Sequence, residues 1–190
     1  MRCLNCEKFS FSYFCNDCKR ILSECTLHKR VINSNLDVYS FYFYSEIKKL
    51  IHSKHKFYGS FIYSKLAKFS FYKFGVNFSY PYKVNAIALD DSVNGDYSQI
   101  AILLKALKSK NIKPIYGALK ALCDVKYSGK TLAYRQQHKR NYTIKKDIKN
   151  PVILVDDIIT TGESMKQAKE ILNKNGIEVL FGLTLANAEF

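Results

Sequence analysis

Short apolar runs alternate along the chain with segments whose apolar residues recur at helical spacing. The runs are rich in β-branched and aromatic residues, which favours buried strands. The pattern predicts strands at 38–44, 85–89, 112–116, 152–155 and 177–185, and helices at 46–54, 61–74, 100–107 and 163–174. This alternation predicts an α/β fold with a parallel sheet and helices on both faces. We expect residues 26–35 to be a linker that precedes this domain.

Two carboxylates and a loop of small polar residues follow the predicted strand 152–155. Asp156 and Asp157 stand where such a strand should emerge from the sheet, and residues 160–164 read Thr-Thr-Gly-Glu-Ser. A helix is predicted directly after this loop. A strand, a loop and a helix in this order present backbone N–H groups and the positive end of the helix dipole to a phosphate group. We expect the loop to be exposed, and Gly162 to let its backbone approach the ligand.

The residue types of this segment fit a ligand with two chemically different ends. Backbone N–H groups and hydroxyls can bind a phosphate monoester, and the residues that offer them are Thr160, Thr161, Gly162, Glu163 and Ser164. Asp156 and Asp157 are hydrogen-bond acceptors at pH 7. They suit sugar hydroxyls, or waters held by a magnesium ion that the phosphates also bind. A sugar 5-phosphate satisfies both ends.

Residues 152–164 resemble the ribose-phosphate-binding motif of the type I phosphoribosyltransferases. The resemblance implies that Asp156 and Asp157 hold the ribose 2- and 3-hydroxyls. It also implies that the Thr-Thr-Gly loop cradles the 5-phosphate of phosphoribosyl pyrophosphate, with Mg²⁺ as cofactor. If chemistry occurs, pyrophosphate is displaced at the ribose anomeric carbon, and the protein's main contribution is charge placement. An ordinary core strand that ends in an acidic turn is the alternative interpretation.

Four cysteines near the N-terminus have the spacing of a zinc ribbon. They form two C-x-x-C pairs separated by eight residues: Cys3, Cys6, Cys15 and Cys18. Two such knuckles can bring four thiolates around one tetrahedral Zn²⁺. The predicted zinc is structural, and it substitutes for a hydrophobic core that so short a segment cannot build. Free thiols are the alternative, and Cys25 with His28 forms a competing ligand pair that ranks second.

The order of these parts narrows the resemblance. An N-terminal double-knuckle finger ahead of a small phosphoribosyltransferase-like domain is similar to the ComF-type competence proteins, which support uptake of transforming DNA from the cytoplasmic side. Weaker signatures fall in family order at residues 56–59, 96–99 and 139–141. The resemblance implies a zinc-ribbon finger over 1–30 and a type I phosphoribosyltransferase-like domain over 36–190. It implies phosphoribosyl pyrophosphate and single-stranded DNA as ligands.

The chain departs from the family at the segment expected to grip pyrophosphate. Residues 88–92 read Ala-Leu-Asp-Asp-Ser in place of a proline-rich strand end, and no arginine or lysine occurs from 85 through 104. Only backbone N–H groups and magnesium could hold pyrophosphate from this loop. His138 stands in place of the arginine of the family's Arg-x-x-Asn signature, although Arg135 or Arg140 could substitute. Binding of the 5-phosphate end is therefore better supported than turnover.

A large excess of basic residues favours a polyanionic partner. Lysine and arginine number 30 against 16 acidic residues, which gives a formal net charge of +14. Residues 126–146 are polar and basic. They lie at the position where phosphoribosyltransferases place a mobile cover. They could instead form a DNA track, with Tyr127, Tyr134 and Tyr142 stacking on bases. The candidate DNA-binding residues are Lys126, Lys130, Arg135, His138, Lys139 and Arg140. The alternatives are a solvated lysine-rich surface and a disordered charged loop.

Neither a secretory signal nor a membrane-spanning run is visible in the sequence. We therefore expect a cytoplasmic protein. If it acts at a membrane, it should do so from the inner face of that membrane. Disulfides are disfavoured in this compartment. Three functions are left open. The first is a DNA-uptake factor that binds phosphoribosyl pyrophosphate and single-stranded DNA. The second is a working phosphoribosyltransferase that acts on a base or an amine. The third is a structural adaptor whose finger docks a helicase or a membrane partner.

Overall fold

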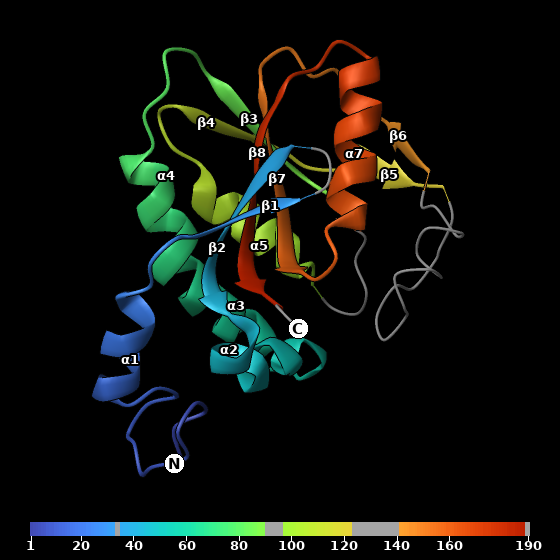
Figure 1. Ribbon diagram of the computed structural model, residues 1–190. Helices are drawn as coiled ribbons and strands as arrows, with labels where there is room; N and C mark the ends of the chain where they lie inside the picture. Colours follow the sequence, from blue (N-terminus) through green and yellow to red (C-terminus); the bar gives the residue numbers. More distant parts are fainter. Residues whose placement is uncertain (33–34, 90–96, 123–140, 189–190) are drawn as a thin grey trace.

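A six-stranded sheet forms the centre of the molecule (Figure 1). The computed structural model describes residues 1–32, 35–89, 97–122 and 141–188. In order across the sheet, the strands are β1 (His28–Ile32), β2 (Leu36–Phe43), β8 (Val179–Asn187), β7 (Val152–Ile159), β3 (Val84–Ala88) and β4 (Ile112–Ile115). Neighbouring strands are parallel except β1, which is antiparallel to β2. The predicted α/β fold with a mostly parallel sheet is confirmed.

Helices cover both faces of this sheet. Their bounds are α1 Asn16–Ser23, α2 Tyr44–Ile51, α3 Gly59–Ala67, α4 Lys73–Asn77, α5 Gln99–Leu107 and α7 Glu163–Lys174. One face packs against α2, α3 and α5, and the other packs against α7 and the small ladder of β5 (Leu119–Ala121) and β6 (Tyr142–Ile144). Side chains of β7 alternate between the two layers: Ile153 and Val155 join the α5 side, whereas Val152 and Leu154 join the α7 side.

The predicted elements are found with boundaries shifted by about three residues or fewer, apart from two differences. The expected helix 61–74 is split into α3, a π-helical turn (Lys68–Tyr72) and α4. At this turn the Ser70 hydroxyl donates to the Leu66 carbonyl at 2.7 Å, a competing bond that favours local distortion of a helix. The second difference is that β7 continues to Ile159, four residues beyond its expected end.

Residues 26–35 are not simply a linker, because they contain the edge strand β1. His28, Arg30 and Ile32 are half-buried or buried, whereas Lys29 and Val31 are exposed. Charged residues are common on edge strands, where they discourage pairing with other chains. The pattern shows no apolar run, so hydrophobicity alone could not reveal this strand. Residues 28–30, which we had included in the finger, belong to the sheet.

The direction in which successive strands are added to the sheet reverses between β3 and β7. From β3 the chain passes through α5 to β4 on one side, and from β7 it passes through α7 to β8 on the other. Ligands of parallel α/β sheets bind at the carboxyl ends of the strands at such a switch point. β3 ends at Ala88 opposite Val155. Asp156 and Asp157 therefore lie in β7 beyond β3, while Asp156 is still paired with Thr184 of β8.

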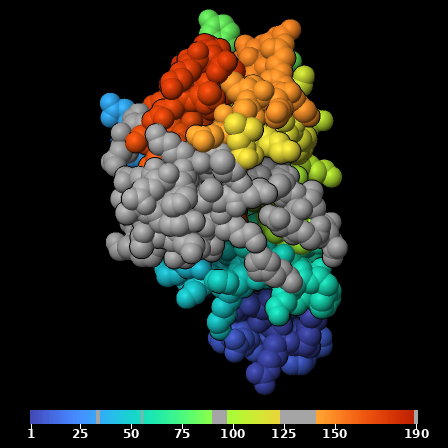
Figure 2. All heavy atoms as spheres, turned by 90° about the vertical axis from the view of Figure 1, so that its right-hand side faces the viewer, coloured from blue at the N-terminus to red at the C-terminus, as the bar shows by residue number. Residues whose placement is uncertain are grey.

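The N-terminal segment with α1 lies at one end of the molecule, and α7 lies at the other (Figures 1 and 2). Tyr42 anchors this segment to the sheet by donating a buried hydrogen bond to the Leu22 carbonyl at 2.6 Å. Among the described residues, no helix has the length and apolar character needed to cross a membrane.

Candidate functional site

The loop between β7 and α7 is shaped by Gly162. This residue has a φ of +77° and precedes the first turn of α7 as its N-cap, a backbone conformation that strongly favours glycine. It is buried, and a Cβ atom placed on it would lie 2.8 Å from Cγ2 of Ile32. Our expectation that the loop is exposed at Gly162 is wrong. The glycine is required because β1 packs directly against the loop.

A small pocket of about 30 Å³ lies at the start of α7. It is lined by Asp156 and by residues 158–165. Six of the seven residues that we predicted to bind phosphoribosyl pyrophosphate line it: Asp156, Thr160, Thr161, Gly162, Glu163 and Ser164. The first turn of the twelve-residue helix α7 contributes its N–H groups and the positive end of its dipole. The helix end of the pocket therefore offers donors of the kind that bind anions, whereas Asp156 and Glu163 add carboxylates to the lining.

The side chain of Glu163 is directed into the helix layer rather than into solvent. It is only 8% exposed, and its carboxylate accepts a hydrogen bond from Gln167 Nε2 at 3.3 Å. The backbone N–H of Glu163 donates to the Thr161 hydroxyl at 3.4 Å. Both contacts hold the loop against the first turn of α7.

The two predicted sugar-binding carboxylates have different surroundings. Asp156 lines the pocket and accepts the backbone N–H of Asp157 at 2.8 Å. Asp157, the seventh predicted residue, contacts Lys54 Nζ and the Tyr63 hydroxyl, each at 3.5 Å from its Oδ2. Burial, together with the negative charge of Asp157, raises the pKa of Tyr63, so this hydroxyl remains a donor. Asp157 is held by cationic and hydroxyl groups from the helical layer.

Three residues near the loop were not singled out from sequence, and a fourth, Tyr97, was included only as part of the weak 96–99 signature. Arg30 of β1 donates to the Thr160 carbonyl at 2.7 Å. Lys54 lies in a 3₁₀ turn (His52–His55) after α2, and Tyr97 donates to its carbonyl at 3.3 Å. Tyr63 comes from α3. Their partners lie between 43 and 130 residues away along the chain, so no local spacing could have identified them.

Part of the 56–59 signature has a packing explanation. Gly59 begins α3, and a Cβ atom placed there would collide with the Ser53 carbonyl and the Tyr97 hydroxyl. This glycine lets α3 approach the turn that carries Lys54. Lys56, in contrast, is exposed.

The candidate DNA-binding residues of the proposed track lie outside the described residues. All six of its candidates fall within 123–140: Lys126, Lys130, Arg135, His138, Lys139 and Arg140. Of the three tyrosines that we expected to stack on bases, Tyr142 is described. Its side chain is 5% exposed and packs in the α7-side core, so it is unavailable for stacking.

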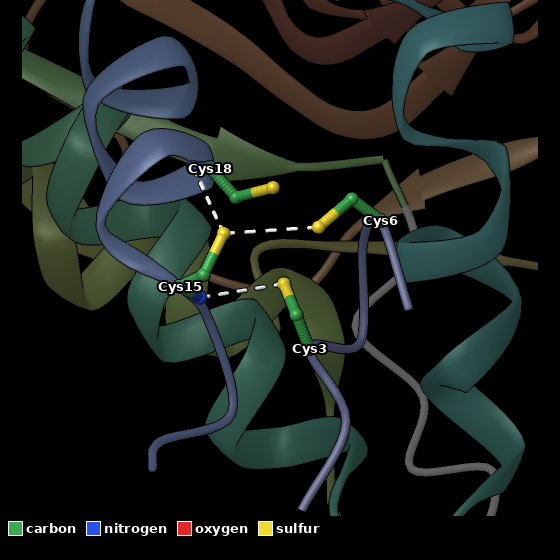
Figure 3. A group of neighbouring side chains, drawn as sticks. All are labelled: Cys3, Cys6, Cys15 and Cys18. Carbon is green, nitrogen blue, oxygen red and sulfur yellow. Dashed lines mark hydrogen bonds between the residues drawn. The ribbon is translucent and has the colours of Figure 1, made fainter. Parts of the chain in front are cut away.

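The four N-terminal cysteines form a cluster (Figure 3). Their sulfur atoms all lie within 4.8 Å of one another, and Cys6 Sγ and Cys15 Sγ are 3.7 Å apart. Four metal–sulfur bonds of about 2.3 Å in a tetrahedron place the sulfurs about 3.8 Å apart. The cluster therefore fits one metal ion, whereas a disulfide requires a sulfur–sulfur distance of about 2.05 Å.

The cysteines of the cluster differ in how readily they ionise. Burial opposes ionisation of Cys3, yet N–H groups that include those of Cys6 and Cys15 lower its pKa to about 6. Cys15 caps the start of α1 and accepts the N–H of Cys18 at 3.5 Å. Burial, and hydrogen bonding with neighbouring thiols, raises the pKa of Cys18 to about 12. A bound cation would allow all four adjacent sulfurs to be ionised together.

The competing pair is not part of the cluster. Cys25 Sγ donates to the Phe69 carbonyl at 3.5 Å, and the His28 ring packs against Phe43 with centroids 4.3 Å apart. Among the described residues, the four-cysteine group is the one set placed to hold a metal ion.

Comparison with known proteins gives weak homology to phosphoribosyltransferases. The chain is 35% identical over 66 residues to an orotate phosphoribosyltransferase of Sulfurisphaera tokodaii. The match covers 32% of this chain and 34% of that protein, so the chain spans about a third of the length of this relative. No family model matches. A hypoxanthine phosphoribosyltransferase structure from Staphylococcus aureus aligns over 66% of this chain and 62% of its own, at 14% identity and a TM-score of 0.41, which is too low to support an argument.

The packing of Ile32 on Gly162 predicts how strongly the loop depends on this glycine. Gly176 provides a matched control, since its φ is +73° but no atom lies within 4 Å of the Cβ position. Alanine at Gly176 should lower the free energy of unfolding by about 1–2 kcal/mol through backbone strain. Alanine at Gly162 should lower it by roughly 1–3 kcal/mol more, because of the added clash.

Urea denaturation of the two variants measures this difference. In an Ile32→Ala background, the extra loss at Gly162 should largely disappear. Equal losses at the two glycines in the wild-type background would contradict the packing argument.

Proposed function

We propose that this protein binds phosphoribosyl pyrophosphate with Mg²⁺ and serves as a DNA-uptake factor that also binds single-stranded DNA. The observation that carries the first part is the pocket at the switch point, where a buried strand, a glycine-shaped loop and the start of α7 meet. Homology to a phosphoribosyltransferase supports the choice of ligand. The DNA-uptake role rests on the resemblance to the ComF-type proteins and on the net charge of +14.

In this proposal the 5-phosphate occupies the pocket formed by residues 160–164. Backbone N–H groups and the hydroxyls of Thr160, Thr161 and Ser164 bind its oxygens. Asp156 and Asp157 accept hydrogen bonds from the ribose hydroxyls, and Lys54 lies beside them at the same edge of the sheet. Magnesium would neutralise charge on the pyrophosphate, and the two carboxylates suit its bound waters.

Lys54 offers a cation that the 85–104 segment lacks. Its Nζ is 3.5 Å from Asp157 and its side chain is 33% exposed, so it can turn toward a polyanion at the strand ends. This placement favours phosphoribosyl transfer as a second candidate function, and the orotate phosphoribosyltransferase relative supports it. In such a reaction, the acceptor nitrogen forms a bond to the anomeric carbon as the bond to the pyrophosphate oxygen breaks.

The cysteine cluster is proposed to hold one structural zinc. Four thiolates without a place for water or substrate fit a closed zinc site, and thiolates at this spacing fit a reducing, cytoplasmic compartment. Phe9 and Phe11 on the same segment are 73% and 94% exposed and pack edge to face. Exposed apolar groups of this kind suit docking to a partner, such as a DNA-uptake helicase at the inner face of the membrane.

A zinc measurement tests the role of the cluster. Purified protein should contain about one zinc per chain, and replacing Cys6 and Cys15 with serine should release it and unfold the N-terminal segment. Cys25→Ser serves as the control and should retain the metal. Atomic absorption reports the metal content and NMR signals of the N-terminal segment report its unfolding, while the signals of the sheet residues should stay unchanged. Full zinc occupancy in the Cys6/Cys15 variant would contradict the assignment.

Calorimetry tests the ligand. Phosphoribosyl pyrophosphate should bind only with Mg²⁺, and ribose 5-phosphate should bind more weakly. Asp156→Asn should reduce affinity for both ligands roughly ten- to a hundred-fold, because a charged hydrogen-bond acceptor is lost. Asp37→Asn, a change at a surface carboxylate paired with Lys29, is the matched control and should leave binding normal.

A 2-deoxyribose analogue sharpens this test, because it removes a partner of the acidic pair without changing the protein. The analogue should bind worse than its parent to the wild type. It should bind nearly as well as its parent to the Asp156→Asn and Asp157→Asn variants. Normal binding by both aspartate variants would defeat the phosphoribosyl interpretation.

Salt dependence tests the DNA partner. If about 4–6 phosphates are contacted, log K should fall with log salt at a slope of roughly −3 to −4. Reversing Lys139 and Arg140 to glutamate should weaken binding to all sequences alike. The matched control reverses Lys108 and Lys110, which are exposed between α5 and β4. Binding that is independent of salt, or equal loss in both variants, would contradict a DNA track over 126–146.

A further inference from the structure

Arg30 connects three strands at the candidate pocket. Its Nη1 donates to the Thr160 carbonyl at 2.7 Å and to Asn187 Oδ1 at 3.2 Å. Asn187 is 3% exposed and lies at the end of β8, where it pairs with Ile159. The next residue, Ala188, donates its N–H to the Ile159 carbonyl at 2.8 Å. Asn187 of β8 therefore fixes the guanidinium, which in turn holds the carbonyl of Thr160, the first residue after β7.

The bond to Thr160 fixes the orientation of a peptide group. In a planar trans peptide the C=O and the following N–H point in opposite directions. Because the Thr160 carbonyl points at Arg30, the N–H of Thr161 points away from β1. A flip of this peptide would break the charged hydrogen bond to Arg30, so the guanidinium selects one of the two orientations.

β1 contacts the loop through two side chains that are not part of the pocket lining. Arg30 and Ile32 alternate with the exposed Lys29 and Val31, so both face the loop. Neither belongs to the pocket lining, which consists of Asp156 and residues 158–165. The N–H that is directed away from β1 belongs to Thr161, which does line the pocket. A cation on the carbonyl also polarises the peptide and strengthens its N–H as a donor.

We propose that Arg30 is a positioning residue of the phosphate-binding loop, which orients the Thr161 N–H toward the phosphate of a sugar-phosphate ligand. This proposal rests on the proposed function of the pocket. It assigns to the antiparallel edge strand β1 an indirect part in ligand recognition, although Arg30 stands 130 positions away from Thr160 in the sequence.

The test compares two variants of the same strand that lose the same charge. Arg30→Gln removes the guanidinium at the loop, and Lys29→Gln removes a cation that is paired with Asp37 at 2.7 Å on the exposed side. Calorimetry with ribose 5-phosphate should show a roughly ten- to a hundred-fold loss of affinity for Arg30→Gln and almost none for Lys29→Gln. Arg30→Lys, which keeps the charge and one donor, should recover part of the loss.

The amide signal of Thr161 provides a local readout. In the wild type it should shift on titration with ribose 5-phosphate, as should the amides of Glu163 and Ser164. In Arg30→Gln the Thr161 response should be lost while the helix amides still respond at high ligand concentration. A role of Arg30 in stability alone would weaken all these responses together, and that result would overturn the proposal.

Asn187→Ala keeps the charge of Arg30 and removes its second anchor, so it replaces Arg30→Gln if that variant does not fold. It should lose affinity roughly two- to ten-fold. If the wild type itself fails to bind ribose 5-phosphate, the proposed function is wrong. If the wild type binds, and Arg30→Gln or Asn187→Ala binds as well as Lys29→Gln, the proposed function stands and the role of Arg30 is refuted.

Discussion

The contact between β1 and the loop after β7 is the constraint on which the candidate site depends. Gly162 must adopt a left-handed backbone, and it must do so with Ile32 at the distance where any side chain would collide. From the same strand, Arg30 holds the carbonyl of Thr160, two residues before Gly162. The first turn of α7 can face a ligand because these contacts fix where the loop ends and the helix begins. An antiparallel strand at the edge of the sheet thus defines a site near its centre.

The distribution of charge around the pocket follows from the same architecture. The segment from 85 to 104 contains no arginine or lysine, but Arg30 and Lys54 reach the carboxyl edge from two other directions. Lys54 lies against Asp157 and Arg30 lies behind the loop. Neither cation belongs to the pocket lining in the described part of the chain. This arrangement leaves backbone N–H groups and hydroxyls as the donors of the pocket lining, and places positive charge where it can stabilise the polyanion that the proposal requires.

The sequence predicted those elements whose formation depends on residues that are close together in the chain. The apolar run 152–155 and the helical spacing after Ser164 predicted β7 and α7, and the repeated C-x-x-C spacing predicted the sulfur cluster. The continuation of β7 through Asp156 and Asp157 was missed, because pairing with β8 rather than hydrophobicity holds these residues in the strand. β1 was missed because an edge strand can be polar. The burial of Gly162 and the roles of Arg30, Lys54 and Tyr63 arise from tertiary contacts, which no spacing encodes.

The central claim is that the start of α7 binds the phosphate of a phosphoribosyl group. A crystal structure with ribose 5-phosphate and Mg²⁺ tests it most directly. The account predicts the phosphate within hydrogen-bonding distance of the backbone N–H groups of residues 161–164, with the ribose hydroxyls on the side of Asp156 and Asp157. A phosphate bound elsewhere, or a ribose directed away from these carboxylates, would contradict it.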